Sequence, residues 1–295
     1  MTATVAEIDP PFELAEPAQP SAPLLLNSPH SGRVYPPDFL ASGRLSLDTL
    51  RRSEDSFVDE LFQPPQDLSL TFMRAHFPRS FIDLNREPYE LDPRMFDGRL
   101  PPFVNTRSLR VAGGLGTIAR VVGDAVEIYD RRLPVEGALQ RIEAYYMPYH
   151  RVLRQALARL YREFQTTVLL DCHSMPSSVV SREDRPKADV VIGDRYGTSC
   201  APLIVETVEA TLRELGYVVH RNKPYAGGFI TEHYGNPAAG HHALQIEINR
   251  ALYLDEAKFR KSVRFERMRD DLVVLIRRLA ELPFADLVPF QAAAE

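Results

Sequence analysis

The segment Thr166–Leu170, with the sequence TTVLL, constrains the fold more than any other part of the chain. Its β-branched and apolar residues are typical of a central strand that is buried on both faces of a parallel sheet. The segment runs directly into Asp171, Cys172 and His173, so polar side chains are expected at the carboxyl end of this strand. Open α/β sheets bind ligands at that edge. The segment therefore predicts an α/β protein with its chemistry at the end of a central strand.

Strands and helices are predicted to alternate along the rest of the chain. The patterns predict strands at 24–26, 68–75, 188–192, 217–220 and 243–248, and helices at 46–62, 133–164, 201–215 and 255–282. Ser46 is the expected N-cap of the first helix, Pro148 is expected to kink the second or divide it into two consecutive pieces, and residues 77–87 are expected to form a loop or strand end. This alternation predicts one α/β domain over residues 23–284, in which helices cover both faces of a mostly parallel, mixed sheet. Residues 1–22 are expected to form an extended arm and residues 285–295 a C-terminal tail.

Composition limits the compartment and the partners. The 295 residues are 44% hydrophobic, enough for a sizeable core, and their net charge of −5 provides no general attraction to nucleic acid or anionic lipid. The chain contains neither a secretory signal pattern nor the roughly 20-residue apolar run that a membrane helix needs. Two cysteines are too few for a disulfide framework. We expect a soluble cytoplasmic protein without a nucleic-acid or membrane partner, and the sequence leaves its oligomeric state open.

Two histidines follow predicted strands. His30 lies in the turn NSPHSG after Leu24–Leu26, and His173 follows the central strand. Histidines at two strand ends are candidate ligands of a metal such as zinc, although either one could be structural. Asp171 precedes His173 by two residues and shares its face of the strand, so it could orient the imidazole or bond to a neighbouring loop.

Acidic residues could complete such a site. Asp55 and Asp59 lie one turn apart on the predicted helix, either as a solvated polar face or beside a cation. In LQIEIN, alternation places Gln245, Glu247 and Asn249 on one face. Glu247 is therefore either a general base that faces a site or part of a half-exposed antiparallel strand.

Basic residues gather in the segment RSFIDLNRE. Arg79, Asn85 and Arg86 could hold a substrate carboxylate, or the arginines could form local ion pairs with Asp83 or Glu87.

Three further segments are glycine-rich or histidine-rich. The segment KPYAGG, followed by His233, is either a mobile loop over a site or a plain turn. The run GGLG is interpreted as a turn, and His241 and His242 as loop residues that do not share a metal.

From about Leu24 to Glu256 the chain resembles the N-formylglutamate amidohydrolase family. The resemblance rests on NSPHSG, DSFVDELF, FPRSFIDLNREP, GGLGTIAR, DCHSMPS, KPYAGGFITEHYG and HALQIEINRALYLDE. That family is similar to zinc carboxypeptidases and aspartoacylases, which have a phosphorylase/hydrolase-like fold. The resemblance implies hydrolysis of N-formyl-L-glutamate to formate and L-glutamate, a step of histidine degradation. The alternatives are another zinc N-acyl-amino-acid hydrolase, a carboxypeptidase-like enzyme acting on another acidic substrate, and a non-catalytic binder of acidic metabolites.

The resemblance also implies a role for each candidate residue. Zn²⁺ would be held by His30, Asp55 and His173, with Glu54 as the alternative carboxylate, and Asp171 would orient His173. Glu247 would carry the proton, Asn85 and Arg86 would bind the substrate carboxylate, and Arg79 and His233 would also contact substrate, Arg79 beside the developing oxyanion. The chain departs from the related patterns at Arg33, which replaces a glutamate, and at Glu232, which replaces a basic residue. The identity of the acidic substrate therefore stays open.

Overall fold

The computed structural model describes residues 8–179 and 187–289. The chain groups into two compact units. The first comprises the described part of Met1–Glu13 with Pro29–Ser56 and Arg74–Leu153, and the second comprises Leu14–Ser28, Phe57–Met73 and the described part of Arg154–Glu295. The predicted domain bounds remain predictions, and residues 1–7 of the predicted arm and 290–295 of the predicted tail lie outside the described residues.

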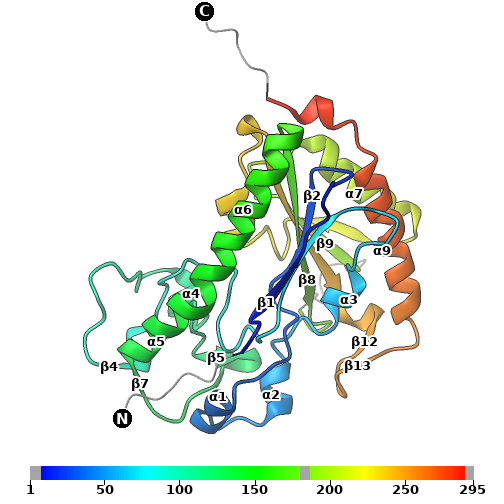
Figure 1. Ribbon diagram of the computed structural model, residues 1–295. Helices are drawn as coiled ribbons and strands as arrows, with labels where there is room; N and C mark the ends of the chain where they lie inside the picture. Colours follow the sequence, from blue (N-terminus) through cyan, green and yellow to red (C-terminus); the bar gives the residue numbers. More distant parts are fainter. Residues whose placement is uncertain (1–7, 180–186, 290–295) are drawn as a thin grey trace, which may run out of the picture. The chain divides into compact units, whose positions relative to one another are not determined.

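A seven-stranded sheet has its central strands in the second unit (Figure 1). Its strands, in spatial order, are β1 (Phe12–Ala15), β3 (Thr71–Ala75), β2 (Leu24–Ser28), β8 (Thr167–Met175), β11 (His241–Asn249), β9 (Val190–Gly193) and β10 (Val219–Arg221). Strand β8 pairs in parallel with both β2 and β11, whereas β11 and β9 are antiparallel. Part of the predicted N-terminal arm is therefore the edge strand β1.

The central strand β8 is buried along its whole length, as its apolar sequence predicts. Leu170 and Cys172 belong to the main hydrophobic core. Successive side chains on a strand point to opposite faces, so Asp171 and His173 lie on the other face. The same alternation on β11 directs Leu244, Ile246 and Ile248 into that core, and Gln245 and Glu247 away from it.

Helices cover the sheet of the second unit on both faces. Buried side chains of α3 (Val58–Leu61), α7 (Pro202–Glu214) and α9 (Phe265–Ala280) form the main core together with the strands. In Figure 1, α7 and α9 lie on one side of the strands, and the C-terminal part of α6 (Met147–Phe164), from Arg154 onward, lies on the other. The predicted α/β class, with a mostly parallel, mixed sheet, is confirmed.

The remaining elements are short. In the first unit they are α1 (Pro37–Ser42), α2 (Leu47–Arg51), α4 (Leu109–Ala112), α5 (Val135–Arg141), and the paired strands β4 (Phe96–Asp97) with β7 (Leu133–Pro134) and β5 (Val121–Val122) with β6 (Val126–Glu127). Between α5 and α6 the helix widens into one π-helical turn, Ile142–Tyr146, so that Pro148 falls in the first turn of α6. Proline has no N–H to donate to the preceding turn, and the wider π-helical turn immediately before it, in which the N–H of Met147 donates to the carbonyl of Ile142, accommodates this loss. The two consecutive helical pieces that were predicted are α5 and α6, which this π-helical turn joins without a break.

The single helix predicted over residues 46–62 is wrong. Ser46 does cap α2 by accepting a hydrogen bond from the backbone N–H of Thr49, but α2 ends at Arg51 and α3 begins only at Val58. Between them the backbone N–H of Asp55 donates to the carbonyl of His30, a bond that a continuous helix could not make. Asp55 and Asp59 therefore do not share a helical face.

Two further predictions are corrected. The helix predicted from residue 255 begins at Phe265, because β12 (Leu254–Asp255) and β13 (Arg260–Lys261) pair first. His241 and His242 are not loop residues, since they begin β11 opposite Thr167 and Val168.

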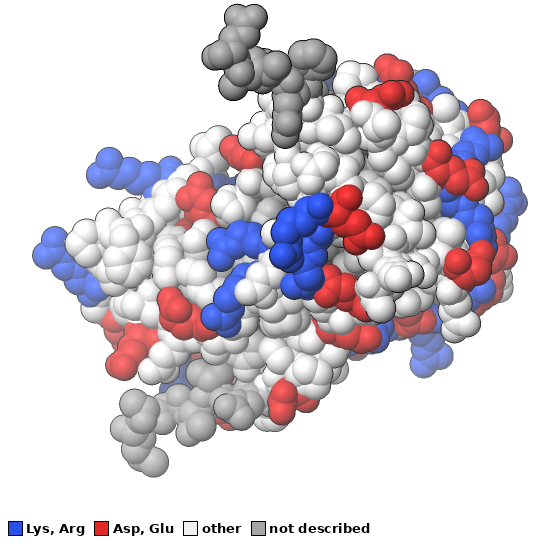
Figure 2. All heavy atoms as spheres, turned by 45° about the horizontal axis from the view of Figure 1, so that its top comes forward, with Lys and Arg blue, Asp and Glu red and all other residues white. Residues whose placement is uncertain are grey.

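Charged side chains of both signs are interspersed on the face shown in Figure 2. Where Lys and Arg side chains gather near the middle of this face, Asp and Glu side chains lie directly beside them. Within residues 8–179 and 187–289, no helix is long and apolar enough to cross a membrane.

Candidate functional site

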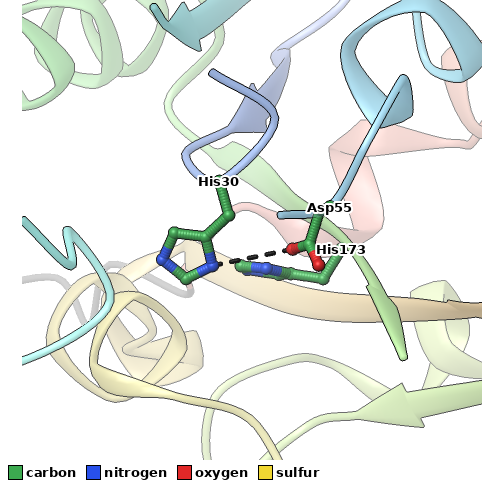
Figure 3. A group of neighbouring side chains, drawn as sticks. All are labelled: His30, Asp55 and His173. Atoms are coloured by element: carbon green, nitrogen blue, oxygen red, sulfur yellow. Dashed lines mark ion pairs between the residues drawn. The ribbon is translucent and has the colours of Figure 1, made fainter. Parts of the chain in front are cut away.

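His30, Asp55 and His173 come together although they are far apart in the sequence (Figure 3). His30 follows the end of β2 by two residues, Asp55 lies between α2 and α3, and His173 lies near the end of β8. Each residue is at most 2% exposed, and one potential ligand atom from each lies within 4.8 Å of the others. The structure thus brings together the three residues that the sequence analysis proposed as ligands.

The imidazole of His30 is oriented by Asp83. Nε2 donates to Oδ1 of Asp83 over 2.7 Å, which turns Nδ1 towards Oδ2 of Asp55 at 3.6 Å. That second distance is too long for a hydrogen bond. It is close to the roughly 3.3 Å that separates two ligands of one tetrahedral zinc ion with bonds of about 2 Å. Nδ1 of His30 and Oδ2 of Asp55 therefore lie at a separation that suits two ligands of one ion.

Two arginines, Arg79 and Arg86, stabilise the ionised form of the Asp83 carboxylate. Burial alone would raise the pKa of this carboxyl, but the positive charges of Arg79 and Arg86, together with His30, hold its pKa well below the usual range. An ionised Asp83 can only accept, so Nε2 of His30 must carry the hydrogen. This fixes the imidazole tautomer that leaves Nδ1 able to bind a cation.

His173 is oriented in the same way from its own strand. Its Nε2 donates to Oδ2 of Asp171 over 2.8 Å, and Oδ1 of Asp171 accepts from Nδ2 of Asn27 on β2 over 3.1 Å. Of the two alternatives that the sequence analysis left open, Asp171 contacts the imidazole, and its second hydrogen bond goes to strand β2 and not to a neighbouring loop. Nδ1 is the nitrogen of His173 that remains for a ligand role.

The donor set fits a zinc ion. Two imidazole nitrogens and one carboxylate oxygen are a common ligand set for catalytic zinc, with further positions left for water or substrate. The neighbouring acid Glu54 is held elsewhere, since its carboxylate accepts from Tyr35, Arg51 and Ser56. Of the two adjacent acids, it is Asp55 that joins the histidines.

Glu247 lies beside His173 in the sheet. The two residues are register partners in the parallel pairing of β11 with β8, and Glu247 is 8% exposed. Oε1 of Glu247 accepts a hydrogen bond from Nε2 of Gln245 over 2.9 Å. Because β11 lies between β8 and β9 and is buried, the alternative of a half-exposed strand is wrong. A carboxylate is therefore placed on the same face as His173.

The segment after Phe77 forms the local ion pairs that the sequence analysis left open. Arg79 donates to Oδ2 of Asp83 over 2.7 Å, and the guanidinium of Arg86 lies 3.6 Å from the same oxygen. Arg86 also donates to the carbonyl of Leu115, and burial lowers its pKa. The backbone N–H of Asn85 also donates to the Asp83 carboxylate, at Oδ1. The substrate-binding roles of Arg79, Asn85 and Arg86 remain predictions.

His233 lies on α8 (Phe229–Tyr234), outside the metal group. Its ring stacks on Phe229 at 4.9 Å between centroids, and burial, aided by the positive charge of Arg154, lowers its pKa. Glu232 on the same helix pairs with Arg195 over 2.8 Å. The substrate contact predicted for His233 remains a prediction.

Asp83 is the residue that the sequence analysis missed as part of the site. It was considered only as an ion-pair partner for the arginines, because its distance of 53 residues from His30 conceals their contact. Its place two residues before the Asn85–Arg86 pair was the available signal that Asp83 belongs to the site, although that signal does not identify His30 as its partner.

Comparisons with known proteins give consistent results. A family model described as N-formylglutamate amidohydrolase matches residues 22–254. Curated proteins named N-formylglutamate deformylase from Pseudomonas putida and Pseudomonas aeruginosa are 27% and 29% identical to this chain, over 80% and 79% of it and 83% of their own lengths. The crystal structure of an N-formylglutamate amidohydrolase from Ralstonia eutropha JMP134 is 39% identical, with a TM-score of 0.86 over 92% of this chain and 97% of that one. A gene product of Agrobacterium tumefaciens, 17% identical with a TM-score of 0.62 over 94% of both chains, shares the fold.

Proposed function

Because the chain belongs to the N-formylglutamate amidohydrolase family, we propose that it hydrolyses N-formyl-L-glutamate to formate and L-glutamate, as a step of histidine degradation, with zinc as its metal. The observation that carries the proposal is the meeting of His30, Asp55 and His173 in a chain that matches this family over residues 22–254. The names of the two Pseudomonas relatives and of the Ralstonia structure support the substrate.

His30, Asp55 and His173 are the residues that would hold the ion, with Asp83 and Asp171 orienting the two imidazoles. When bound, zinc supplies Lewis-acid chemistry, lowering the pKa of a coordinated water to about 7 and polarising a carbonyl oxygen. The carboxylates of Asp83 and Asp171 make the imidazoles more basic and hold them in one tautomer.

Glu247 is the proposed proton carrier. Its carboxylate accepts a proton from the water that attacks the formyl carbon, and then returns that proton to the leaving amine nitrogen as the C–N bond breaks. The position of Glu247 on β11, as register partner of His173, supports this role because the two side chains share one face of the sheet. Its near-complete burial also shields the carboxylate from bulk water.

Asn85, Arg86, Arg79 and His233 are the proposed contacts of the acidic substrate. Guanidinium and amide groups match a carboxylate geometrically, which favours Asn85 and Arg86 for that task, and Arg79 is proposed to stabilise the developing oxyanion. Both arginines already contact Asp83, so binding of a substrate carboxylate would exchange or share those contacts.

A formate-release assay tests the proposal. The purified protein is incubated with N-formyl-L-glutamate after chelation and after re-addition of zinc, and N-acetyl-L-glutamate and glutamate-terminated dipeptides serve as competing substrates. We expect formate release that is lost on chelation and restored by zinc. If N-acetyl-L-glutamate or the dipeptides are cleaved faster than N-formyl-L-glutamate, the proposed substrate is wrong, although the proposed hydrolytic chemistry stands. Binding of N-formyl-L-glutamate without turnover in the zinc-loaded protein would overturn the proposed activity.

A further inference from the structure

We infer that Gln245 is a positioning residue that couples the glycine loop, residues 225–228, to the carboxylate of Glu247. The inference rests on the proposed function, because it concerns how the proposed proton carrier is held. Gln245 precedes Glu247 by two residues on β11, so both side chains lie on the face of the sheet opposite the main core. Gln245 is 4% exposed, and its amide spans the space between the loop and the carboxylate.

The orientation of the Gln245 amide follows from its hydrogen bonds to Gly228 and Glu247. The backbone N–H of Gly228 lies 2.8 Å from Oε1, and a backbone N–H can only donate, so the amide oxygen must face the loop. The amide nitrogen is thereby directed to Oε1 of Glu247, to which it donates over 2.9 Å. An amide turned the other way would place its NH₂ group against the N–H of Gly228 and its oxygen against a carboxylate. One hydrogen bond therefore enforces the other.

The loop is held against the sheet at the level of Gln245. Gly193, the last residue of β9, is the register partner of Gln245. A Cβ at Gly193 would lie 2.6 Å from the nitrogen of Gly227 and 2.7 Å from the carbonyl carbon of Ala226, so only glycine allows this close backbone approach. The backbone N–H of Arg195, two residues after Gly193, donates to the carbonyl of Ala226 over 2.8 Å and also holds the loop.

Gly227 makes the turn that directs the next N–H at Gln245. Its φ of +110° is a left-handed conformation that L side chains rarely adopt, and a Cβ there would lie 2.4 Å from Oγ1 of Thr231. The hydroxyl of Thr231 donates to the carbonyl of Gly228 and so fixes the peptide after this turn. The loop therefore presents the N–H of Gly228 in a defined direction.

The arrangement links the state of the loop to that of the base. When residues 225–228 lie against β9, the amide of Gln245 holds Oε1 of Glu247 and so orients the carboxylate. When the loop moves away, Oε1 of Gln245 loses its donor and the amide can rotate away from the carboxylate. Catalysis depends steeply on such placement, since an error of about 1 Å can lower a rate about 100-fold.

Isosteric substitution tests the inference. Gln245→Met keeps the size of the side chain but removes both hydrogen bonds. We expect kcat for formate release to fall roughly 10- to 100-fold, with KM within about twofold of wild type and bound zinc unchanged. The matched control is Asn249→Leu. Asn249 is two residues after Glu247 on the same strand, and its amide bonds to Ala188 and Ala251. We expect its kcat to stay near wild type.

A double variant separates positioning from a general packing effect. If Gln245 acts through Glu247, adding Gln245→Met to Glu247→Gln lowers the residual rate no further. Gly193→Ala is a second test of the coupling, because it pushes the loop outward and leaves the side chains of Gln245 and Glu247 unchanged. We expect it to lower kcat in the same way as Gln245→Met. It replaces Gln245→Met as the test if that variant does not fold. An additive loss in the double variant, an equal loss in Asn249→Leu, or an unchanged kcat in Gln245→Met and Gly193→Ala would overturn the coupling. If Glu247→Gln itself keeps wild-type activity, the proposed role of Glu247 fails, and the coupling fails with it.

Discussion

Nε2 of His30 donates to Oδ1 of Asp83 over 2.7 Å, and the same carboxylate is bound by Arg79 and lies close to Arg86. The charge that orients the imidazole is thus itself held by two cations within the same short segment of sequence. Asp83→Ala is expected to lower zinc affinity about 10- to 100-fold, because the imidazole loses its orienting acceptor. Competition titration with a chromogenic chelator measures this affinity.

The control for Asp83→Ala is Asp92→Ala. Asp92 is also a buried carboxylate bound by two arginines, Arg94 and Arg120, but among the residues that the structure describes it forms no hydrogen bond with a histidine. Equal loss of zinc affinity in the two variants would show that the effect reflects general destabilisation and not the orientation of His30.

His173→Ala is expected to abolish both zinc retention and formate release. Removing a ligand has a larger effect than removing its orienting partner, so affinity should fall by more than about 100-fold. Metal content measured by atomic emission after gel filtration checks this. His242→Ala is the matched control, since His242 is equally buried but lies outside the metal group of the described residues and should leave the zinc content unchanged. Stoichiometric zinc in His173→Ala would remove this residue from the ligand set.

Glu247→Gln is expected to retain zinc and lose turnover. The amide keeps the shape of the side chain but cannot accept a proton, and general acid–base catalysis contributes about 100- to 10,000-fold. Steady-state kcat for formate release at full zinc occupancy measures the loss. Activity near that of wild type would place the base elsewhere.

The buried carboxylate of Asp92 is expected to make the stability of the folded protein depend on pH. Burial raises the pKa of its carboxyl, but hydrogen bonds from Arg94 and Arg120 outweigh burial and leave the pKa below 3.8. A carboxyl whose pKa is lower in the folded state than in the unfolded state stabilises the protein at pH values above its unfolded-state pKa. This stabilisation is lost as the pH falls through its folded-state pKa. Asp92→Asn should therefore lower the free energy of unfolding by about 1–3 kcal/mol at pH 7, and by less below pH 3.8. Urea unfolding at pH 7, 4.5 and 3 checks this, and a difference that grows as the pH falls would contradict it.

The strands and the faces of their side chains could be predicted because they depend on local pattern. The run TTVLL predicts a buried strand wherever it lies, and alternation then determines that Asp171 and His173 share a face. The same reasoning placed Gln245 and Glu247 together on β11. Both features require only neighbouring residues.

The segment around Asp55 could not be predicted because contacts far away in sequence decide it. Residues 46–62 have helical spacing, yet the backbone of Asp55 bonds to His30 and Glu54 bonds to Tyr35. These contacts outweigh helix propensity, which is worth less than about 1 kcal/mol per residue. For the same reason the contact between Asp83 and His30 was not foreseen, since nothing in either local segment indicates the other.

Cys172 lies between Asp171 and His173 in the sequence, but its sulfur is fully buried in the main core on the opposite face of β8, and burial raises the pKa of its thiol well above the usual range. No thiolate from this strand can therefore reach an ion held by His30, Asp55 and His173, and these three side chains offer only nitrogen and oxygen. Such a set does not select strongly among small divalent transition ions, whose affinities rise from manganese through cobalt and nickel to copper. Exchange of zinc for cobalt should thus be possible without rebuilding the site, and the ion carried in the cell should follow metal supply as well as affinity.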